Sequence, residues 1–356
     1  MHGGFRGRDR VVVTLQQPRG IRLLEADNDS SNNAERSNGD EGVPDDALTL
    51  AASLERLVRG GWDELESSIV QFDTDADIPG TRAVLRCHFL RSDPNGAPRL
   101  NALANQLADQ VVHFCIPRTD LLEAQALPPD RSAQAISRLA RDAQKLFTQT
   151  QLKTGEGAEL LLYALLEKQL GIPQVLSKMS LKTSTEVHYH GADGVHAQLL
   201  DNGDLAVYWG EAKMYESVDE AMADCLTSLN PYLNGTAYEQ DVFLIRHFAD
   251  TGNEQLTARL LEYFDDGSLK SANVEMRGAC LIGFTHASYP KLPRELEAVR
   301  EEVEALLKKW NKSMATRLGN RNLTSHAIEV FFLPVPSAQG FRDAIKRALN
   351  IPVISP

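Results

Sequence analysis

The chain has 356 residues, of which 42% are hydrophobic and 24% charged, and it carries a formal net charge of −12. These proportions are typical of globular proteins and exclude the collagen-like, coiled-coil and wholly disordered classes. The acidic total also argues against a uniformly basic coat for nucleic acid. At about 100–200 residues per domain, the chain fits one large domain or two medium ones.

The N-terminal segment combines a short strand pair with an acidic stretch. We expect strands over 11–15 and 21–24. Between Glu25 and Asp46 there are eight acids and one base, so this stretch carries −7 and leaves −5 for the rest of the chain. Asn, Ser, Asp and Gly dominate this stretch, so burial of its few apolar side chains cannot offset the entropy that the backbone would lose on ordering. A mobile loop is therefore predicted over 25–46. Such a loop is either solvated or a tail that mimics the charge of DNA or contacts a basic partner.

The following residues, up to about 150, predict a helical, mixed α/β module. Apolar residues recur at helical spacing over 100–114, where Leu103, Leu107 and Val111 share one face, and again over 132–147. A further helix is expected over 48–58 and a strand over 83–90.

The remaining residues, 151–356, predict an α/β sheet of mixed direction. A helix over 155–170 should end at Gly171 and Pro173. Two strands, 187–199 and 204–215, are joined through Asn202-Gly203, a strong hairpin signal. The other expected elements are strands over 174–179, 242–248, 279–284 and 326–333, and helices over 218–229, 254–264, 294–312 and 341–349.

Apolar runs and cysteines predict the compartment. The longest apolar block, Leu160–Leu166, is far shorter than the about 20 residues that a membrane span needs. The four cysteines form no Cys-x-x-Cys pair, which is typical of a reducing compartment, and each is expected to be a small buried apolar residue. We therefore expect a soluble, cytoplasmic protein with no membrane partner.

Four residues carry the candidate chemistry: Glu159 in the helix over 155–170, Asp193 in the first hairpin strand, and Glu211 and Lys213 in the second. Residues two apart in a strand point to the same face, so Glu211 and Lys213 continue an otherwise apolar row. The hairpin brings Asp193 beside Glu211, and carboxylates from neighbouring strands suit a hard divalent cation such as Mg²⁺. Lys213 could orient or deprotonate an attacking water, or neutralise charge in the transition state.

These residues resemble the pattern of the PD-(D/E)XK nuclease superfamily. The matching segments are Gly155–Leu160, Gly191–Val195 and Gly210–Met214, and Ala192 stands in place of the proline in the superfamily's name. The resemblance implies a restriction-endonuclease-like α/β core, in which helices flank a mixed central sheet, with an N-terminal α/β extension.

The resemblance also implies roles for individual side chains. Asp193 and Glu211 would hold the metal, Glu159 would complete its ligand set, and Lys213 would serve the attacking water. Glu156, one turn before Glu159 on nearly the same helix face, is the competing helix glutamate.

A closer resemblance, to the HamA family, covers most of the chain. It rests on the Gly-Glu-Gly-Ala-Glu helix, the Ala-Asp-Gly-Val and Trp-Gly-Glu-Ala-Lys strands, and the closing segment Glu329–Pro336. The resemblance implies a nuclease effector of the bacterial Hachiman anti-phage system, which cuts DNA with Mg²⁺, or Mn²⁺ in its place, when a HamB-type helicase releases or activates it. It also implies a partner interface within 1–150 and a nuclease domain over 151–356.

A zinc site is the main rival to this interpretation. His188, His190 and His196 partly resemble the zinc motif of metallo-β-lactamases, but Ala192 stands where that motif has Asp. The sequence contains neither a Gly-x-Ser-x-Gly elbow nor a Gly-x₄-Gly-Lys-Ser/Thr loop, so a serine hydrolase or NTPase site is not expected, and any ATP use must come from a partner.

Two simpler alternatives remain open. A surface salt bridge would explain Glu211 and Lys213 without any chemistry. A non-catalytic adaptor with a nuclease-like fold, which binds a helicase, would explain the resemblance. The intact set of Asp193, Glu211 and Lys213 argues against the adaptor, because decay of a site usually removes one of the three.

Contact with DNA requires local positive charge in so acidic a chain. The alternative for basic residues near a helix end is favourable placement at its negative C-terminus. The candidates are Lys178 and Lys182 before the hairpin, Arg246, Arg277, and a cluster around Trp310 formed by Lys308, Lys309, Lys312, Arg317 and Arg321.

Overall fold

The computed structural model describes residues 45–59, 63–72, 75–149, 155–177, 179, 192–235, 238–287, 289 and 300–353. The chain divides into two compact units, Met1–Gly42 and Val43–Pro356, and the described residues all belong to the second. The strand pair expected over 11–24 and nearly all of the acidic stretch therefore lie outside the described residues. The last two acids of that stretch begin helix α1 (Asp45–Glu55).

A sheet of eight strands, counted over the described residues, forms the centre of the second unit, in the order β1-β3-β8-β7-β6-β5-β4 with β2 paired to β3. Strands β6, β7, β8 and β3 are parallel neighbours, whereas β4, β5 and β6 pair antiparallel. The predicted α/β fold with a mixed sheet is confirmed. The strands are β1 (Ile69–Gln71), β2 (Ala76–Asp77), β3 (Arg82–Leu90), β4 (Gln174–Ser177), β5 (Gly194–Leu199), β6 (Leu205–Tyr215), β7 (Val274–Thr285) and β8 (Ala327–Val335).

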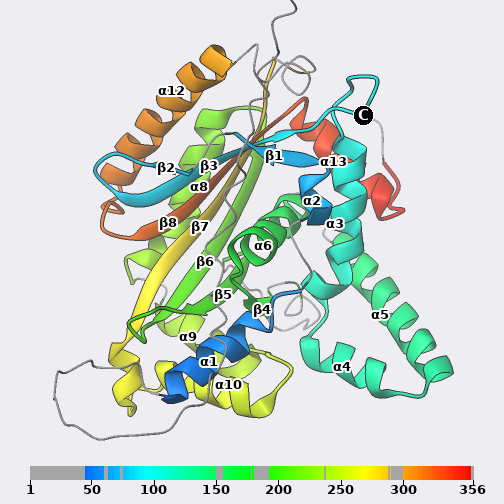
Figure 1. The fold of residues 1–356 in the computed structure, drawn as a ribbon, viewed down its shortest axis with the longest axis vertical. Helices are drawn as coiled ribbons and strands as arrows, with labels where there is room; N and C mark the ends of the chain where they lie inside the picture. Colours follow the sequence, from blue (N-terminus) through cyan, green and yellow to red (C-terminus); the bar gives the residue numbers. More distant parts are fainter. Residues whose placement is uncertain are drawn as a thin grey trace, which may run out of the picture. The chain divides into compact units, whose positions relative to one another are not determined.

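Helices cover both faces of this sheet. Helices α8 (Val218–Leu233) and α12 (Arg300–Gly319) pack on one face, and α6 (Glu156–Leu170) lies across the other, where α3 (Leu100–Cys115) and α13 (Ala338–Ala348) join the same core (Figure 1). The other helices of the described part are α1, α2 (Asp63–Glu66), α4 (Arg118–Ala126), α5 (Pro129–Gln149), α9 (Tyr238–Phe248) and α10 (Glu254–Leu261).

Strand β6 lies between these two layers, which explains why its sequence is almost continuously apolar. Leu205, Val207 and Trp209 pack in the core shared with α8, whereas Ala206 and Tyr208 pack in the core shared with α6. The row of β6 side chains that packs against α8 therefore continues with positions 211 and 213.

Helix α6 confirms the prediction over 155–170 and is buried on nearly all sides. All residues from Ala158 to Lys168 are buried. The helix ends at Gly171, whose φ of 69° is a left-handed conformation that glycine adopts without strain. The Gly171 N–H donates to the carbonyl of Glu167 at 3.1 Å and closes the last turn.

The prediction of a strand over 242–248 is wrong, because these residues lie in helix α9. Val242, Leu244 and Ile245 are buried, whereas Phe243 and Phe248 are 54% and 41% exposed. A short apolar run does not distinguish a strand from a helix by its periodicity, and here the run lies on a helix that is partly exposed. The predicted helix over 294–312 begins outside the described residues, and the helix found there, α12, continues beyond the predicted end to Gly319.

The two predicted halves of the chain share one sheet. Strand β3 pairs with β8 along Arg82–Cys87. The boundary expected at residue 150 lies outside the described residues, and the division into two domains remains a prediction.

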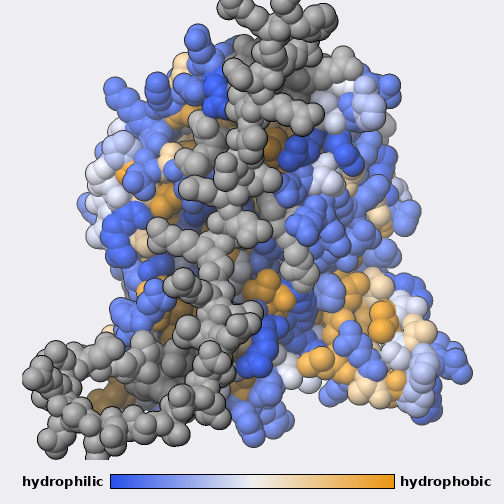
Figure 2. Space-filling model, viewed as in Figure 1, coloured by the Kyte–Doolittle hydropathy of each residue, from blue (hydrophilic) through white to orange (hydrophobic). Residues whose placement is uncertain are grey.

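The surface in view is mostly hydrophilic, with an apolar patch over α4 and α5 (Figure 2). Leu122 of α4 is 50% exposed, and Leu127, which follows that helix, is 40% exposed. None of the described helices is long and apolar enough to cross a membrane. All four cysteines are buried, as expected, and none of them forms a disulfide bond.

Candidate active site

The β5–β6 hairpin places Asp193 beside Glu211. Gly194 pairs with Gly210, and the Asp193 N–H donates to the Gly210 carbonyl at 2.8 Å. Asp193 directly precedes β5, and its contacts are with Gly210 and Ala212, the residues on either side of Glu211, so it lies beside Glu211. Oδ2 of Asp193 accepts a hydrogen bond from the Ala212 N–H at 2.9 Å, which orients the carboxylate where the pairing of β5 ends.

Lys213 lies on the same face as Glu211, two residues further along β6. Its Nζ donates to Oε1 of Glu211. Burial lowers the pKa of Lys213, but the Glu211 carboxylate, and after it Asp193, more than offset this effect and raise the pKa above its usual value. Lys213 is therefore an ammonium cation in this state, which favours orienting and neutralising roles over that of a proton acceptor.

These three charges lie in a largely buried position. Asp193 and Glu211 are 6% and 5% exposed, and the Lys213 side chain is 20% exposed. Removing charges from water costs several kcal/mol per ion, so buried charges are generally paired or bind a cation. Lys213 forms an ion pair with Glu211 within this group of charges.

Glu159 lies in the first turn of α6, in the layer opposite α8. It is 9% exposed, and Glu156 is 7% exposed, so both helix glutamates are buried. A Cβ added at Gly155 would lie 3.4 Å from Oε1 of Glu159, which places this carboxylate against the N-terminal end of its own helix. A negative charge is favourable at that end because it complements the helix dipole. The structure brings Asp193, Glu211 and Lys213 together, and the inclusion of Glu159 in the site remains a prediction.

The donor set fits a hard divalent cation in its chemistry. Asp193 and Glu211 offer carboxylate oxygens, the ligands that Mg²⁺ prefers. Over the residues that the structure describes, no three His, Cys, Asp or Glu side chains are grouped so as to hold a metal ion. Asp193, directly before β5, and Glu211, in β6, are the two carboxylates of the predicted ligand set that the structure places near each other.

Close packing explains the glycines beside these charges. A Cβ at Gly210 would lie 3.3 Å from both the Gly194 carbonyl oxygen and Cδ2 of Leu162, a side chain of α6. Such contacts are tighter than ordinary van der Waals distances. The small residues that flank the site in the sequence therefore allow β5, β6 and α6 to approach each other.

Of the three histidines considered as zinc ligands, the structure describes only His196, and its surroundings argue against a zinc site. His196 is 2% exposed, and its Nδ1 lies 3.0 Å from the carbonyl of Ile172. Burial lowers its pKa to about 4, and the ring packs 6.2 Å from that of Tyr163. His196 is thus a neutral core residue, and His188 and His190 lie outside the described residues, as do Lys178 and Lys182.

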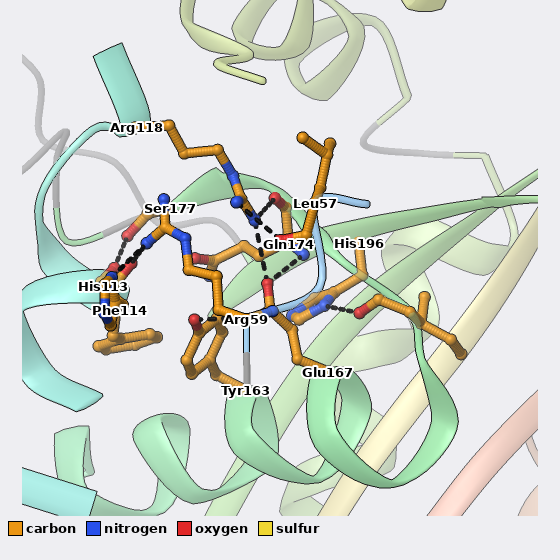
Figure 3. Close-up of polar contacts among 11 residues, drawn as sticks. Leu57, Arg59, His113, Phe114, Arg118, Tyr163, Glu167, Gln174, Ser177 and His196 are labelled. Carbon is orange, nitrogen blue, oxygen red and sulfur yellow. Dashed lines mark hydrogen bonds and ion pairs between the residues drawn. The ribbon is translucent and has the colours of Figure 1, made fainter. Parts of the chain in front are cut away.

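A buried ionic cluster that the sequence did not predict anchors the other end of α6 (Figure 3). The Glu167 side chain is only 1% exposed. Its Oε1 accepts from Arg118 at 3.1 Å and from the Gln174 N–H at 3.0 Å, and its Oε2 accepts from Tyr163 at 3.1 Å and from the Arg59 N–H at 3.3 Å. This Glu167 cluster ties α6 to β4, to the start of α4 and to the segment after α1. The available signal was an acidic residue directly after the apolar run Leu160–Leu166.

Arg59, a member of this cluster, also contacts His113. Its guanidinium lies 2.9 Å from Nδ1 of His113 and donates to the His113 carbonyl at 3.1 Å (Figure 3). Burial, and after it the Arg59 charge, lower the pKa of His113 to about 4. The neutral ring can then accept the hydrogen bond from Arg59.

The mixed sheet, the helices on both faces and the carboxylate pair on the β5–β6 hairpin define an α/β protein with a nuclease-like core. A family model, HamA, matches residues 64–349, which is most of the chain. The chain belongs to the HamA family, and this confirms the resemblance seen in its sequence. Membership implies a role in Hachiman anti-phage defence. A comparison with curated proteins finds no match.

Proposed function

We propose that the protein is a metal-dependent DNA endonuclease, the effector of an anti-phage complex, and that a HamB-type helicase releases or activates it. The main support is the placement of Asp193 beside Glu211, with Lys213 on the same face of β6. Family membership supports the defence context.

Asp193 and Glu211 would hold Mg²⁺, or Mn²⁺ in its place, and Glu159 would complete the ligand set. A bound divalent cation supplies charge stabilisation at the phosphoryl group and lowers the pKa of a water. The hydrogen bond from the Ala212 N–H to Oδ2 fixes the orientation of the Asp193 carboxylate. Lys213 presents an ammonium beside Glu211, where it can donate to a water or to a phosphate oxygen.

Cleavage of supercoiled plasmid DNA in the presence of Mg²⁺ tests the catalytic assignment. We expect Asp193→Asn to abolish nicking and linearisation, and Lys213→Met to slow them by about 10²-fold or more. Asp201→Asn is the matched control, because Asp201 is an exposed carboxylate in the turn of the same hairpin. Retention of cleavage by both site variants would contradict the proposed site.

Metal binding provides a readout that does not depend on cleavage. Mn²⁺ titration, followed by the paramagnetic resonance signal of the free ion, should show that wild-type protein and Asp201→Asn bind Mn²⁺. Asp193→Asn and Glu211→Gln should bind it at least about tenfold more weakly, because the loss of even an outer-shell partner costs about 10–100-fold. Equal affinity in all four proteins would favour the non-catalytic adaptor.

Co-expression with a neighbouring helicase gene tests the partner. We expect the two chains to copurify, and addition of DNA with adenosine triphosphate to switch cleavage on. Constitutive cleavage by the isolated chain that the helicase leaves unchanged would contradict the proposed control.

A further inference from the structure

The second half of α12 and the turn after it are strongly basic. Residues 305–325 contain five bases and no acid. The first half of the helix is acidic, with glutamates at 301, 302 and 304. Positive charge is therefore concentrated on one end of this helix.

Two of the five bases bind α8. Arg317 forms an ion pair with Asp219 at 2.6 Å. Arg321 donates to Oγ1 of Thr227 at 3.1 Å and to the Ala223 carbonyl at 3.3 Å. These contacts hold the end of α12 against α8, so these two arginines have a structural role.

The other three bases face solvent. Lys308, Lys309 and Lys312 are exposed, and within the described part of the chain none of them forms an ion pair. Attraction to the negative end of the helix does not account for them. That effect falls off within the last turn, whereas the three lysines lie seven to eleven residues before Gly319.

A shallow groove of about 430 Å³ lies along this part of α12. It is lined by Lys309, Lys312, Ser313, Thr316, Arg317 and Asn320. None of the lining residues is an acid, and the ammonium groups of Lys309 and Lys312 can donate to phosphate oxygens. From residue 309 to its end at Gly319 the helix rises about 15 Å, enough to follow one DNA strand over several nucleotides.

The groove is connected to the candidate site through α8. Asp219, the ion-pair partner of Arg317, lies in the first turn of α8. That helix begins five residues after Lys213 on the same chain. A polyanion bound along α12 would therefore lie on the layer of helices that covers the face of the sheet carrying Glu211 and Lys213.

We propose that this groove binds the phosphate backbone of duplex DNA and holds the substrate beside the candidate site, an inference that rests on the proposed nuclease function. Lys309 and Lys312 make the phosphate contacts, with Lys308 at the edge. Their contribution is electrostatic and independent of base sequence.

Binding of a short fluorescent duplex to the full chain, in the Asp193→Asn background and over a series of salt concentrations, tests this surface. Each phosphate contact contributes about 0.9 to the slope of log K against log salt concentration. We expect the double variant Lys309→Ala/Lys312→Ala to reduce that slope by about 1.8. The matched control is Lys346→Ala/Arg347→Ala in the last turn of α13, on the other face of the sheet. It should leave the slope unchanged, and both variants should retain the wild-type melting temperature.

The outcomes distinguish this surface from the proposed function. If the α12 double variant binds with the parental slope, or the parent does not bind the duplex, the groove is not a DNA surface, even if the wild type cleaves plasmid. A reduced slope in a chain that never cleaves would support the surface and contradict the nuclease. Stronger binding to duplex RNA of the same sequence than to DNA would overturn the choice of DNA.

Discussion

Substitution of Glu167 tests how α6 is held in place. The carboxylate accepts hydrogen bonds from Arg118, Tyr163 and the backbone N–H groups of Gln174 and Arg59, and its side chain is 1% exposed. Glu167→Gln preserves the shape of the side chain but replaces one carboxylate oxygen by an NH₂ group, which cannot accept a hydrogen bond. Two donors then lose their acceptor, and the Arg118 guanidinium, 11% exposed, loses its counter-charge.

The expected cost is large. A buried donor without an acceptor costs about 1–3 kcal/mol, and removing one partner of a buried ion pair costs about 3–5 kcal/mol in total. Typical free energies of unfolding are about 5–15 kcal/mol, so Glu167→Gln should remove a substantial fraction of the stability. Arg118→Met in the Glu167→Gln background should restore part of it, since it removes the uncompensated charge.

Urea unfolding measures this effect through the midpoint and the slope. We expect a lower midpoint with an unchanged slope for Glu167→Gln, and a coupling of about 0.5–3 kcal/mol in the double-mutant cycle. Asp142→Asn breaks an exposed pair with Lys145 and should leave the midpoint unchanged. A Glu167→Gln midpoint equal to that of Asp142→Asn would refute the reasoning that the Glu167 cluster stabilises the fold.

Two further predictions concern pH and packing. Burial lowers the pKa of His88 and of His196 from 6.5 to about 4. Between these two pH values the histidines bind protons in the unfolded chain but remain neutral in the folded chain. The resulting contribution to stability is complete above pH 6.5 and is lost as the pH falls from about 6.5 to about 4, by about 1.4 kcal/mol per histidine and pH unit. Urea midpoints measured at several pH values should show this loss. The midpoint should depend less steeply on pH in His196→Gln. Gly210→Ala should cost about 1–3 kcal/mol in urea unfolding because its Cβ would press on the Gly194 carbonyl. Gly319→Ala, where nothing lies within 4 Å, should be neutral.

The parts of the fold that could be predicted from the sequence are those encoded locally. The turn at Asn202-Gly203 specifies the β5–β6 hairpin, and the residue directly before β5, Asp193, then lies beside Glu211. Helix α6 could be predicted because its apolar run is long and is followed by Gly171 in a left-handed conformation. The site could therefore be anticipated as far as it depends on one hairpin.

Features that depend on distant neighbours could not be predicted. Glu167 is separated from Arg118 and Arg59 by 49 and 108 residues, so no local pattern signals that they meet. The segment around Val242 has an apolar run that suits a strand, and only the packing of the folded chain shows that it is helical. The place of Glu159 relative to Asp193 depends likewise on how α6 packs against β6.

The net charge of −12 is compatible with a DNA-binding surface because the charges are segregated along the chain. The acidic stretch 25–46 accounts for −7, whereas residues 305–325 carry five bases and no acid. At physiological ionic strength, charges further apart than about 8 Å are largely screened. A phosphate in the α12 groove would therefore respond to Lys309 and Lys312 and to the ion pair of Arg317 with Asp219, rather than to the total charge. The local sign of the charge decides whether a polyanion can bind, and at the groove along α12 that sign is positive.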